Sequence, residues 1–291
     1  MQIILKAILS VTASIVFLAA GGISAQPNNT YIRILPIGDS ITWGYGSTSG
    51  NGYRLNLRKL LAGSNVTYHG HYRSGTMANN NNEGYSGKLI AEIETYVRGN
   101  GTLAEGPNII LLLAGTNDIN IDHKSTTAPE GLDSLIDLVT TSCDDAAVIV
   151  SEIIPIGGVE QEARVQIYNA AISRIVAMRT GSAGGGKPIL VLNMSDYVIA
   201  ADLGDGLHPT DEGYQKMADG WLDGIKQVVK KGWLNANISD SVSVTSDGST
   251  TAVLSISGEP ATQISLGLNI EAELGRSVLA FVVVMGLGSV L

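Results

Sequence analysis

The sequence predicts a three-layer α/β/α domain built on a parallel sheet. Between Tyr31 and about Lys231, short apolar runs alternate with helical patterns, which is the order of parallel strands joined by crossover helices. Most of these apolar runs are continuously aliphatic, as is typical of strands that are covered on both faces. The chain has 291 residues, of which 44% are hydrophobic, so one large domain with a sizeable core and short extensions is expected.

The individual elements follow from the same pattern. We expect a central five-stranded sheet with strands at Tyr31–Ile37, Val66–Gly70, Asn108–Leu113, Ala146–Val150 and Ile189–Leu192. The expected helices are Tyr53–Ala62, Lys88–Val97, Pro129–Thr141, Glu160–Arg179 and Asp211–Lys230. This alternation indicates a flavodoxin-like fold, in which ligands lie beyond the carboxyl ends of the strands.

Charge and cysteine content exclude several classes of partner. The net charge is −9, and an acidic protein repels phosphate backbones, so no nucleic acid is expected. The single cysteine, Cys143, ends an apolar helical pattern and is expected to be a buried structural thiol. One cysteine and four histidines do not suffice for a structural zinc cluster.

The amino-terminal segment is typical of a signal peptide. Residues 1–25 carry one charge, at Lys6, followed by an apolar stretch and small residues up to Ala25. We expect cleavage between Ala25 and Gln26, with an uncleaved membrane anchor as the alternative. Secretion is in keeping with five Asn-x-Ser/Thr sequons, of which those at Asn65 and Asn100 lie in polar, loop-like segments, whereas Asn193 is expected to be more buried. The other two sequons are at Asn28 and Asn237.

The composition changes after the expected domain, which spans residues 26–235. Residues 236–276 form a polar tail rich in Ser and Thr, and residues 277–291 form an uncharged, mostly apolar run. This arrangement is typical of a GPI-attachment signal, with Gly267 or Asn269 as the attachment residue. The alternatives are a plain tail or a short membrane segment.

Polar residues follow three of the expected strands. Ser40 comes after the first strand within Gly38-Asp39-Ser40, and Asn117 follows the central strand within Gly115-Thr116-Asn117-Asp118. Asp205 and His208 precede the last helix, at a spacing that lets a carboxylate orient an imidazole as in a Ser-His-Asp triad. Taken singly, each of these stretches is also typical of a turn, a helix cap or a surface loop.

A glycine loop, Glu83 to Gly87, completes the set. Its glycines allow a close backbone approach, and an exposed N–H there suits an oxyanion hole. In their chain order these features resemble the four blocks of the SGNH (GDSL-type) hydrolases, over about residues 31–232. Within that superfamily, Gly38 to Gly44 and Glu83 to Gly87 are similar to carbohydrate esterase family 3 and related fungal-type secreted esterases. Tyr85 departs from the pattern, since many relatives have His there.

The resemblance implies a serine esterase that works through an acyl-enzyme. Ser40 matches the nucleophile, His208 the base and Asp205 its acidic partner. Ser40 and Gly87 match the backbone N–H donors of the oxyanion hole. Gly84 is the other candidate for the glycine donor. Asn117 matches the side-chain donor. No metal or organic cofactor is implied.

The implied substrate is an acetylated polysaccharide such as xylan. Trp43, Tyr45 and Arg54 are candidates for lining a sugar subsite, the alternatives being loop packing for the aromatic residues and a surface ion pair for Arg54. Two other functions stay open: a lipolytic or short-chain ester hydrolase, and a non-catalytic, surface-attached binding module. We expect a secreted monomer. If the C-terminal tail is an anchor signal, we expect it to attach the protein to a membrane.

Overall fold

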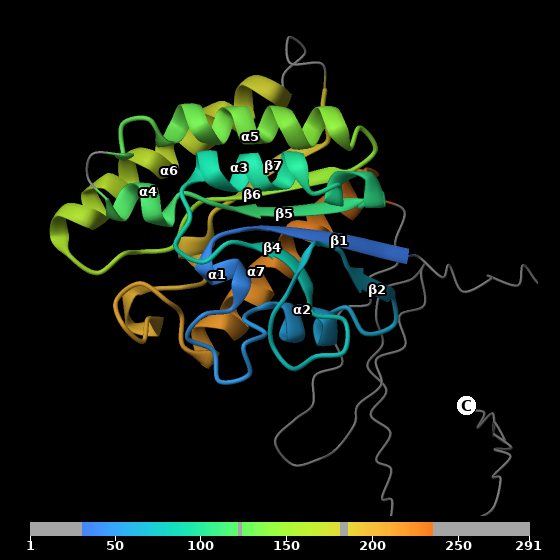
Figure 1. Cartoon of the computed structure of the whole chain (residues 1–291), viewed down its shortest axis with the longest axis horizontal. Coiled ribbons are helices and arrows are strands. Elements are labelled where there is room, and N and C mark those ends of the chain that lie inside the picture. Colours follow the sequence, from blue (N-terminus) through green and yellow to red (C-terminus); the bar gives the residue numbers. More distant parts are fainter. Residues whose placement is uncertain (1–30, 122–123, 181–185, 235–291) are drawn as a thin grey trace, which may run out of the picture. The chain divides into compact units, whose positions relative to one another are not determined.

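The computed structural model describes residues 31–121, 124–180 and 186–234, and these form an α/β domain around a mostly parallel sheet (Figure 1). The five expected strands are present, in the order β2–β1–β5–β6–β7. Their bounds are β1 Tyr31–Gly38, β2 Asn65–Tyr68, β5 Ile109–Leu113, β6 Ala147–Ser151 and β7 Ile189–Leu192. This order is the flavodoxin-like one, so the three-layer α/β/α prediction is confirmed.

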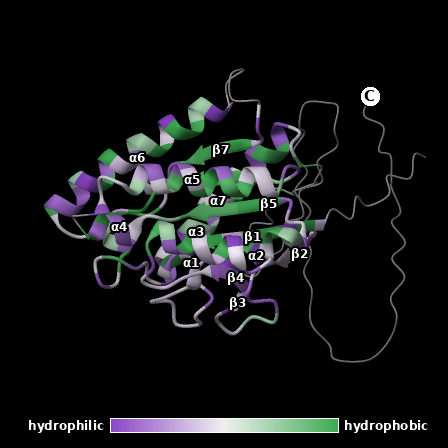
Figure 2. Cartoon of the chain, turned by 45° about the horizontal axis from the view of Figure 1, so that its top comes forward, coloured by the Kyte–Doolittle hydropathy of each residue, from purple (hydrophilic) through white to green (hydrophobic). Residues whose placement is uncertain are grey.

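Helices cover both faces of the sheet. The long ones are α2 Arg54–Leu60, α3 Ile90–Gly99, α5 Ala128–Ser142, α6 Val159–Thr180 and α7 Asp211–Lys230. α3, α5 and α6 lie on one side, and α2 and α7 on the other (Figure 1). The central strand β5 is buried along its whole length and alternates between the two cores: Ile110 and Leu112 pack with the first group of helices, and Leu111 and Leu113 with the second. The hydropathy colouring shows these strands as hydrophobic (Figure 2), as expected for strands that are covered on both faces.

Within the described ranges the sheet has seven strands, two more than the five expected. β4 Asn81–Gly84 pairs in parallel with the last two residues of β1, beyond the stretch that pairs with β2. β3 Tyr72–Arg73 pairs antiparallel with β4. Both strands are polar in sequence, so no run of apolar residues indicates them. The pairing of β4 with β1 brings the Glu83–Gly87 loop to the end of β1, next to Ser40.

Two further helices are too short to show a periodic pattern. α1 Ser40–Trp43 follows β1, and α4 Thr116–Asn120 follows β5. Both begin directly after the carboxyl end of a strand, so each presents its first residues at the edge of the sheet where ligands bind in this fold.

Cys143 and the sequons can be placed in this fold. Cys143 is buried and its thiol contacts the carbonyl of Leu103, as expected for a structural cysteine. Asn193 is exposed, contrary to expectation. The amide of Asn100 donates to the fully buried Glu83 at 2.7 Å, so its nitrogen is engaged inside the fold rather than presented in a free loop.

Several expectations lie outside the described residues: the signal peptide at 1–25, the polar tail at 236–276 and the apolar segment at 277–291, together with the sequons at Asn28 and Asn237. Among the residues that the structure describes, no helix has both the length and the apolar character needed to cross a membrane.

Candidate active site

Ser40 lies at the carboxyl end of β1, as the first residue of α1. Asp39 caps this short helix: its buried carboxylate accepts a hydrogen bond from the N–H of Ile41 at 3.0 Å. Burial raises the pKa of Asp39, a shift that the hydrogen bond and the nearby His208 oppose. Ser40 itself is 4% exposed, so its hydroxyl is held by the turn rather than free in solvent.

The turn before Ser40 depends on Gly38. A Cβ built on Gly38 would lie 2.1 Å from the carbonyl oxygen of Leu113 on the neighbouring strand and 2.4 Å from the hydroxyl of Thr42. Any side chain would therefore separate the end of β1 from the end of β5. Glycine at this position keeps the two strand ends, and with them Ser40 and Asn117, close together.

His208 and Asp205 lie in the loop that leads into α7. Thr210 caps α7 by accepting from the N–H of Gly213, and the loop is closed by an isolated bridge between Leu203 and Pro209. Within it, the Asp205 carboxylate accepts from the N–H of Leu207 at 3.0 Å and from the N–H of His208 at 2.8 Å. These bonds fix the carboxylate beside the imidazole.

The three side chains form a continuous chain of hydrogen bonds. Nδ1 of His208 is 2.8 Å from Oδ2 of Asp205, and Nε2 is 2.9 Å from Oγ of Ser40. An ionised carboxylate only accepts, so Nδ1 carries the hydrogen and Nε2 is left to accept from the Ser40 hydroxyl. Burial acts to raise the pKa of Asp205, but the bonds from the His208 ring and from the two backbone N–H groups lower it to about 2. The carboxylate is therefore charged at neutral pH.

The structure distinguishes the two candidates for the glycine donor of the oxyanion hole. Gly87 is exposed, with φ +76° and open space around its α-carbon, whereas Gly84 is buried against the backbone of Trp43. Between the two candidates, this favours Gly87. Among the described residues, no turn, cap or side-chain hydrogen bond uses the N–H of Ser40 or Gly87 as a donor. Both groups are thus available to a ligand.

Asn117 is tied to the same loop. Its amide nitrogen donates to the carbonyl of Lys88 at 2.9 Å, which leaves the second amide hydrogen for another acceptor. The next residue, Asp118, accepts from the N–H of Ile90, the first residue of α3, at 3.1 Å. Neither hydrogen bond was predicted from the sequence. The Asn-Asp pair after β5 is the only feature of the sequence that indicates them. Together they fix the glycine loop against the end of β5.

The three candidates for lining a substrate subsite have different environments. Tyr45 is 49% exposed, and its ring centroid lies 4.4 Å from that of the His208 ring. Its backbone carbonyl accepts from the hydroxyl of Tyr214 in α7. Trp43 is partly exposed at the end of α1. Both positions are compatible with a group bound at Ser40.

The structure contradicts both expectations for Arg54. It is fully buried, so it neither lines a substrate subsite nor forms a surface ion pair. Its guanidinium donates to the carbonyls of Trp43, Gly50, Ser74 and Asn80 and to the hydroxyl of Ser74. Burial lowers its pKa. Arg54 thus acts from inside the fold, by joining the loop after α1 to the loop between β3 and β4.

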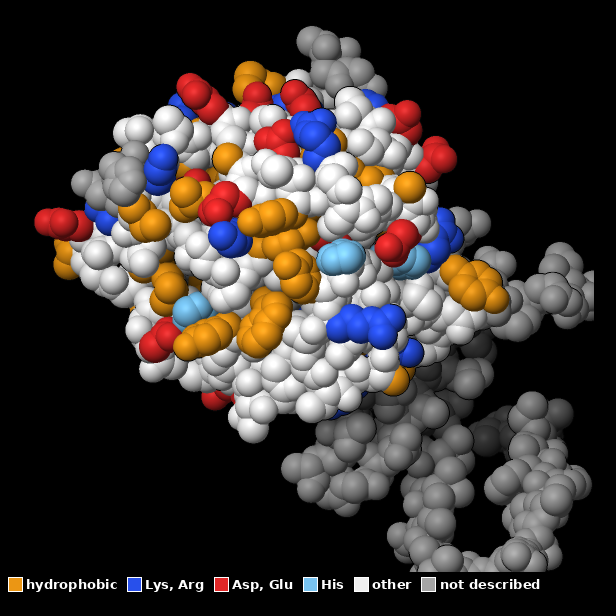
Figure 3. Space-filling model, in the orientation of Figure 1, with side chains coloured by type: hydrophobic (Ala, Val, Ile, Leu, Met, Phe, Trp, Pro, Cys, Tyr) orange, Lys and Arg blue, Asp and Glu red, His pale blue; other side chains and the backbone are white. Residues whose placement is uncertain are grey.

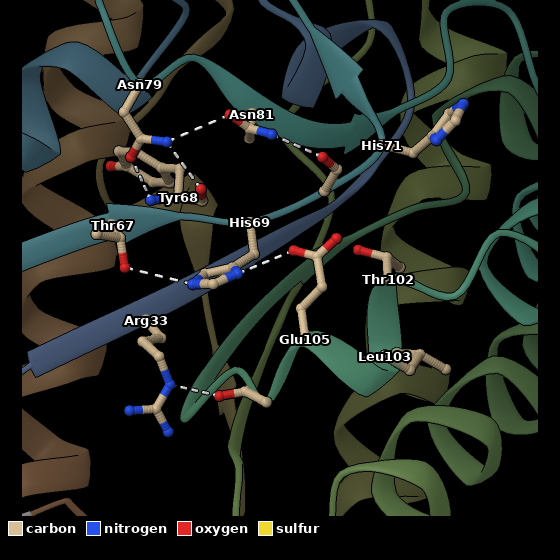
Figure 4. A network of polar contacts seen from close by, with 12 residues as sticks. Arg33, Thr67, Tyr68, His69, His71, Asn79, Asn81, Thr102, Leu103 and Glu105 are labelled. Atoms are coloured by element: carbon tan, nitrogen blue, oxygen red, sulfur yellow. Dashed lines mark hydrogen bonds and ion pairs between the residues drawn. The ribbon is translucent and has the colours of Figure 1, made fainter.

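The other histidines that the structure describes lie apart from this centre. His69 is held between the hydroxyl of Thr67 and the carboxylate of Glu105, and the ring of His71 points away from that of His69 (Figure 4). Across the described ranges, no three or more His, Cys, Asp or Glu side chains are grouped so as to hold a metal ion.

The fold and the geometry of the active site together define a class of enzyme. A serine, a histidine and an aspartate joined by hydrogen bonds, next to free N–H groups at the end of a parallel sheet, form the arrangement of a hydrolase with a serine nucleophile. A family model for the GDSL-like lipase/acylhydrolase family matches residues 37–216. This match spans more than half of the chain, which therefore belongs to that family and is a hydrolase acting on ester bonds.

The chain is similar to an esterase and to two solved structures of carbohydrate esterases. A multidomain esterase from Ruminococcus flavefaciens is 29% identical over 231 residues, which make up 68% of this chain and 29% of the relative. The chain thus spans less than a third of that protein. Among solved structures, a family 3 carbohydrate esterase from Clostridium thermocellum is similar with a TM-score of 0.60 and 29% identity, covering 69% of this chain and 99% of that one. A family 3 enzyme from Talaromyces cellulolyticus, with a TM-score of 0.55, 24% identity and coverage of 69% and 99%, shares the fold.

Proposed function

We propose that this domain removes acetyl groups from acetylated polysaccharides such as xylan, using Ser40 as the nucleophile. The observation that carries the proposal is the 2.9 Å contact between Oγ of Ser40 and Nε2 of His208, in a chain similar to a family 3 carbohydrate esterase over nearly the whole of that enzyme. The amino-terminal pattern supports an action outside the cell.

In the proposed reaction, Nε2 of His208 takes the hydroxyl proton while Oγ of Ser40 attacks the acetyl carbonyl carbon. The negative charge that develops on the carbonyl oxygen is stabilised by the N–H groups of Ser40 and Gly87 and by the amide of Asn117. The bond to the sugar oxygen then breaks, and His208 gives its proton to that oxygen. Water repeats the sequence on the acetyl-enzyme, releasing acetate and restoring the hydroxyl of Ser40.

One exposed aromatic residue beside the triad favours a sugar as the bound group. The exposed Tyr45 beside His208 suits a sugar ring better than an acyl chain, since its hydroxyl stays in water.

An activity panel tests this proposal. Acetate release from acetylated xylan is measured beside hydrolysis of p-nitrophenyl esters of increasing chain length. The proposal expects acetate release from the polymer, loss of all activity in Ser40→Ala, and the fastest ester turnover with acetate. Faster turnover of long acyl chains, with no release from the polymer, would replace the deacetylase by a lipolytic enzyme.

A further inference from the structure

Three tyrosine rings contact one another beside the glycine loop of the active site. The rings of Tyr85 and Tyr96 are stacked, with centroids 4.9 Å apart and planes inclined by 20°. The ring of Tyr72 meets that of Tyr85 edge-on, at 5.1 Å. Tyr72 is 45% exposed and Tyr96 40%, whereas Tyr85 is buried between them. We call these three residues the aromatic platform.

A buried carboxylate fixes the platform in place. Glu83 is fully buried and accepts from the hydroxyl of Tyr85, from the backbone N–H of His71 and from the amide of Asn100. The hydroxyl of Tyr85 also accepts from Asn100 at 3.0 Å. The central ring is thus held by its hydroxyl and by both neighbouring rings. The side chains of the platform would therefore lose little conformational entropy when a ligand packs on them.

The platform is continuous with the active site. The N–H of Tyr85 donates to the carbonyl of Gly38, two residues before Ser40, and Tyr85 is itself two residues before Gly87. Nζ of Lys88 lies 6.0 Å from the ring centroid of Tyr96, and the backbone carbonyl of Lys88 accepts from Asn117. The loop that carries the proposed oxyanion donor Gly87 thus also carries the central ring of the platform.

Tyr45, which is 49% exposed, is a further aromatic residue at the active site, because its ring lies against that of His208. In the space-filling view, hydrophobic side chains gather in a band that runs from the middle of this face toward its lower left, with histidines beside it (Figure 3).

We propose that the aromatic platform binds the sugar rings that neighbour the acetylated sugar of a polysaccharide chain. This inference rests on the proposed function. The C–H groups on the flat face of a sugar ring pack favourably on the electron-rich face of an aromatic ring, while the sugar hydroxyls stay in water. The rim suits such a ligand, since Arg73 and His71 are exposed and Lys88 is partly exposed, and these side chains donate hydrogen bonds to hydroxyl groups. A lipid acyl chain would gain nothing from these donors.

The test compares the double variant Tyr72→Ala/Tyr96→Ala with the wild-type protein on acetylated xylan, on short acetylated xylo-oligosaccharides and on p-nitrophenyl acetate. The loss of two stacking rings is expected to lower kcat/KM on the polymer about tenfold. The same variant is expected to lose less than about twofold on p-nitrophenyl acetate, which is too small to reach the platform. The proposal also expects the wild-type protein to prefer longer oligosaccharides, and this preference should disappear in the variant.

Two further variants serve as controls. Tyr31→Ala removes a more exposed tyrosine, 57% exposed, at the end of β1 that is remote from Ser40, and it is expected to behave as wild type on every substrate. Tyr72→Phe/Tyr96→Phe keeps the rings and should retain most of the activity on the polymer. The melting temperature of each variant shows whether it is folded.

The possible outcomes are distinct. If the alanine double variant deacetylates the polymer as fast as the wild-type protein, the platform is not a sugar site although the proposed function stands. If it loses activity equally on polymer and p-nitrophenyl acetate, the rings only support the glycine loop. A selective loss on long-chain esters would mean that the platform binds acyl groups. If the wild-type protein releases no acetate from any polymer, the proposed function fails and the platform proposal with it.

Discussion

Asp205 holds His208 at two points. One carboxylate oxygen accepts from Nδ1 of the imidazole ring at 2.8 Å, and the other accepts from the backbone N–H of the same residue at 2.8 Å. The side chain of Asp205 is 53% exposed, whereas that of His208 is 13% exposed. A largely exposed carboxylate thus fixes both the position and the tautomer of a nearly buried ring, through bonds within one short loop.

Replacing Asp205 by Asn should therefore affect turnover more than folding. An amide in this place no longer selects the tautomer with hydrogen on Nδ1, and kcat on p-nitrophenyl acetate is expected to fall by about 10²–10⁴. Asp144→Asn is a matched control, because Asp144 is an exposed carboxylate paired with Lys187. A fall of less than about tenfold in Asp205→Asn would show that the carboxylate does not orient the base. Since the pKa of Asp205 is about 2, any loss of activity between pH 4 and 7 is not expected to come from this residue.

Asn117→Ala removes the side-chain donor of the proposed oxyanion hole. Loss of one such donor is expected to lower kcat by about 10²–10³, with a smaller change in KM. Asn120→Ala provides the comparison, because Asn120 is an exposed amide in the same short helix, α4. Steady-state kinetics on p-nitrophenyl acetate measure both. Equal kinetics in the two variants would remove Asn117 from the oxyanion hole.

Arg54→Met should destabilise the fold. The substitution removes the hydrogen bonds from the guanidinium to the carbonyls of Trp43, Ser74 and Asn80, although the carbonyls of Trp43 and Asn80 keep other donors. Hydrogen bonds to a charged group contribute about 1.5–3 kcal/mol each, so the free energy of unfolding should fall by about 3 kcal/mol or more. Arg58→Met, on the exposed side of α2, should change it by less than about 0.5 kcal/mol. Urea unfolding measures the free energy of unfolding of both variants. Similar midpoints for the two would contradict the role given to Arg54.

Asp118 is expected to make stability depend on pH. Burial raises the pKa of this carboxyl to about 6, from its usual value of 3.8, although the bond from the N–H of Ile90 opposes the shift. The folded state therefore binds the proton more tightly than the unfolded state does. The contribution of Asp118 to stability is fully present below pH 3.8 and is lost as the pH rises through 6.

Asp118→Asn removes this titration. Urea unfolding between pH 4 and 7.5 should show a smaller fall in the free energy of unfolding for the variant than for the wild-type protein. Some of the fall should remain, because the pKa of Asp39 is also raised and its contribution has the same sign. Parallel pH profiles for the two proteins would mean that Asp118 ionises in the folded protein as it does in the unfolded chain.

The sequence was most informative where burial is complete. Three of the strands that it predicts, β5, β6 and β7, have nearly continuous aliphatic runs, because both of their faces are covered. Ser40, Asn117, Asp205 and His208 each follow a strand or precede a helix within a short motif, and the structure brings these four positions together at one edge of the sheet. Local sequence was sufficient there because strand ends in a parallel sheet share one edge.

Local sequence was insufficient where an element is held by distant partners. β4 is a polar stretch that forms a strand because the end of β1 has no other partner on that side and because Asn82 binds Ser74 and Asn80. Arg54 resembles a surface residue of a helix, and only the closure of two loops over it makes it part of the interior. The platform likewise joins β3, the loop after β4 and α3, and no spacing in the sequence indicates such contacts.

The proposed nucleophile and its base are 168 residues apart in the chain. During translation, Ser40 is therefore synthesised early and His208 only near the end of the domain. Until α7 has formed and the loop before it has docked beside β1, the serine hydroxyl has no partner to take its proton. The nascent chain is consequently inert toward esters during most of its translation, and the first turnover of substrate marks the completion of the domain.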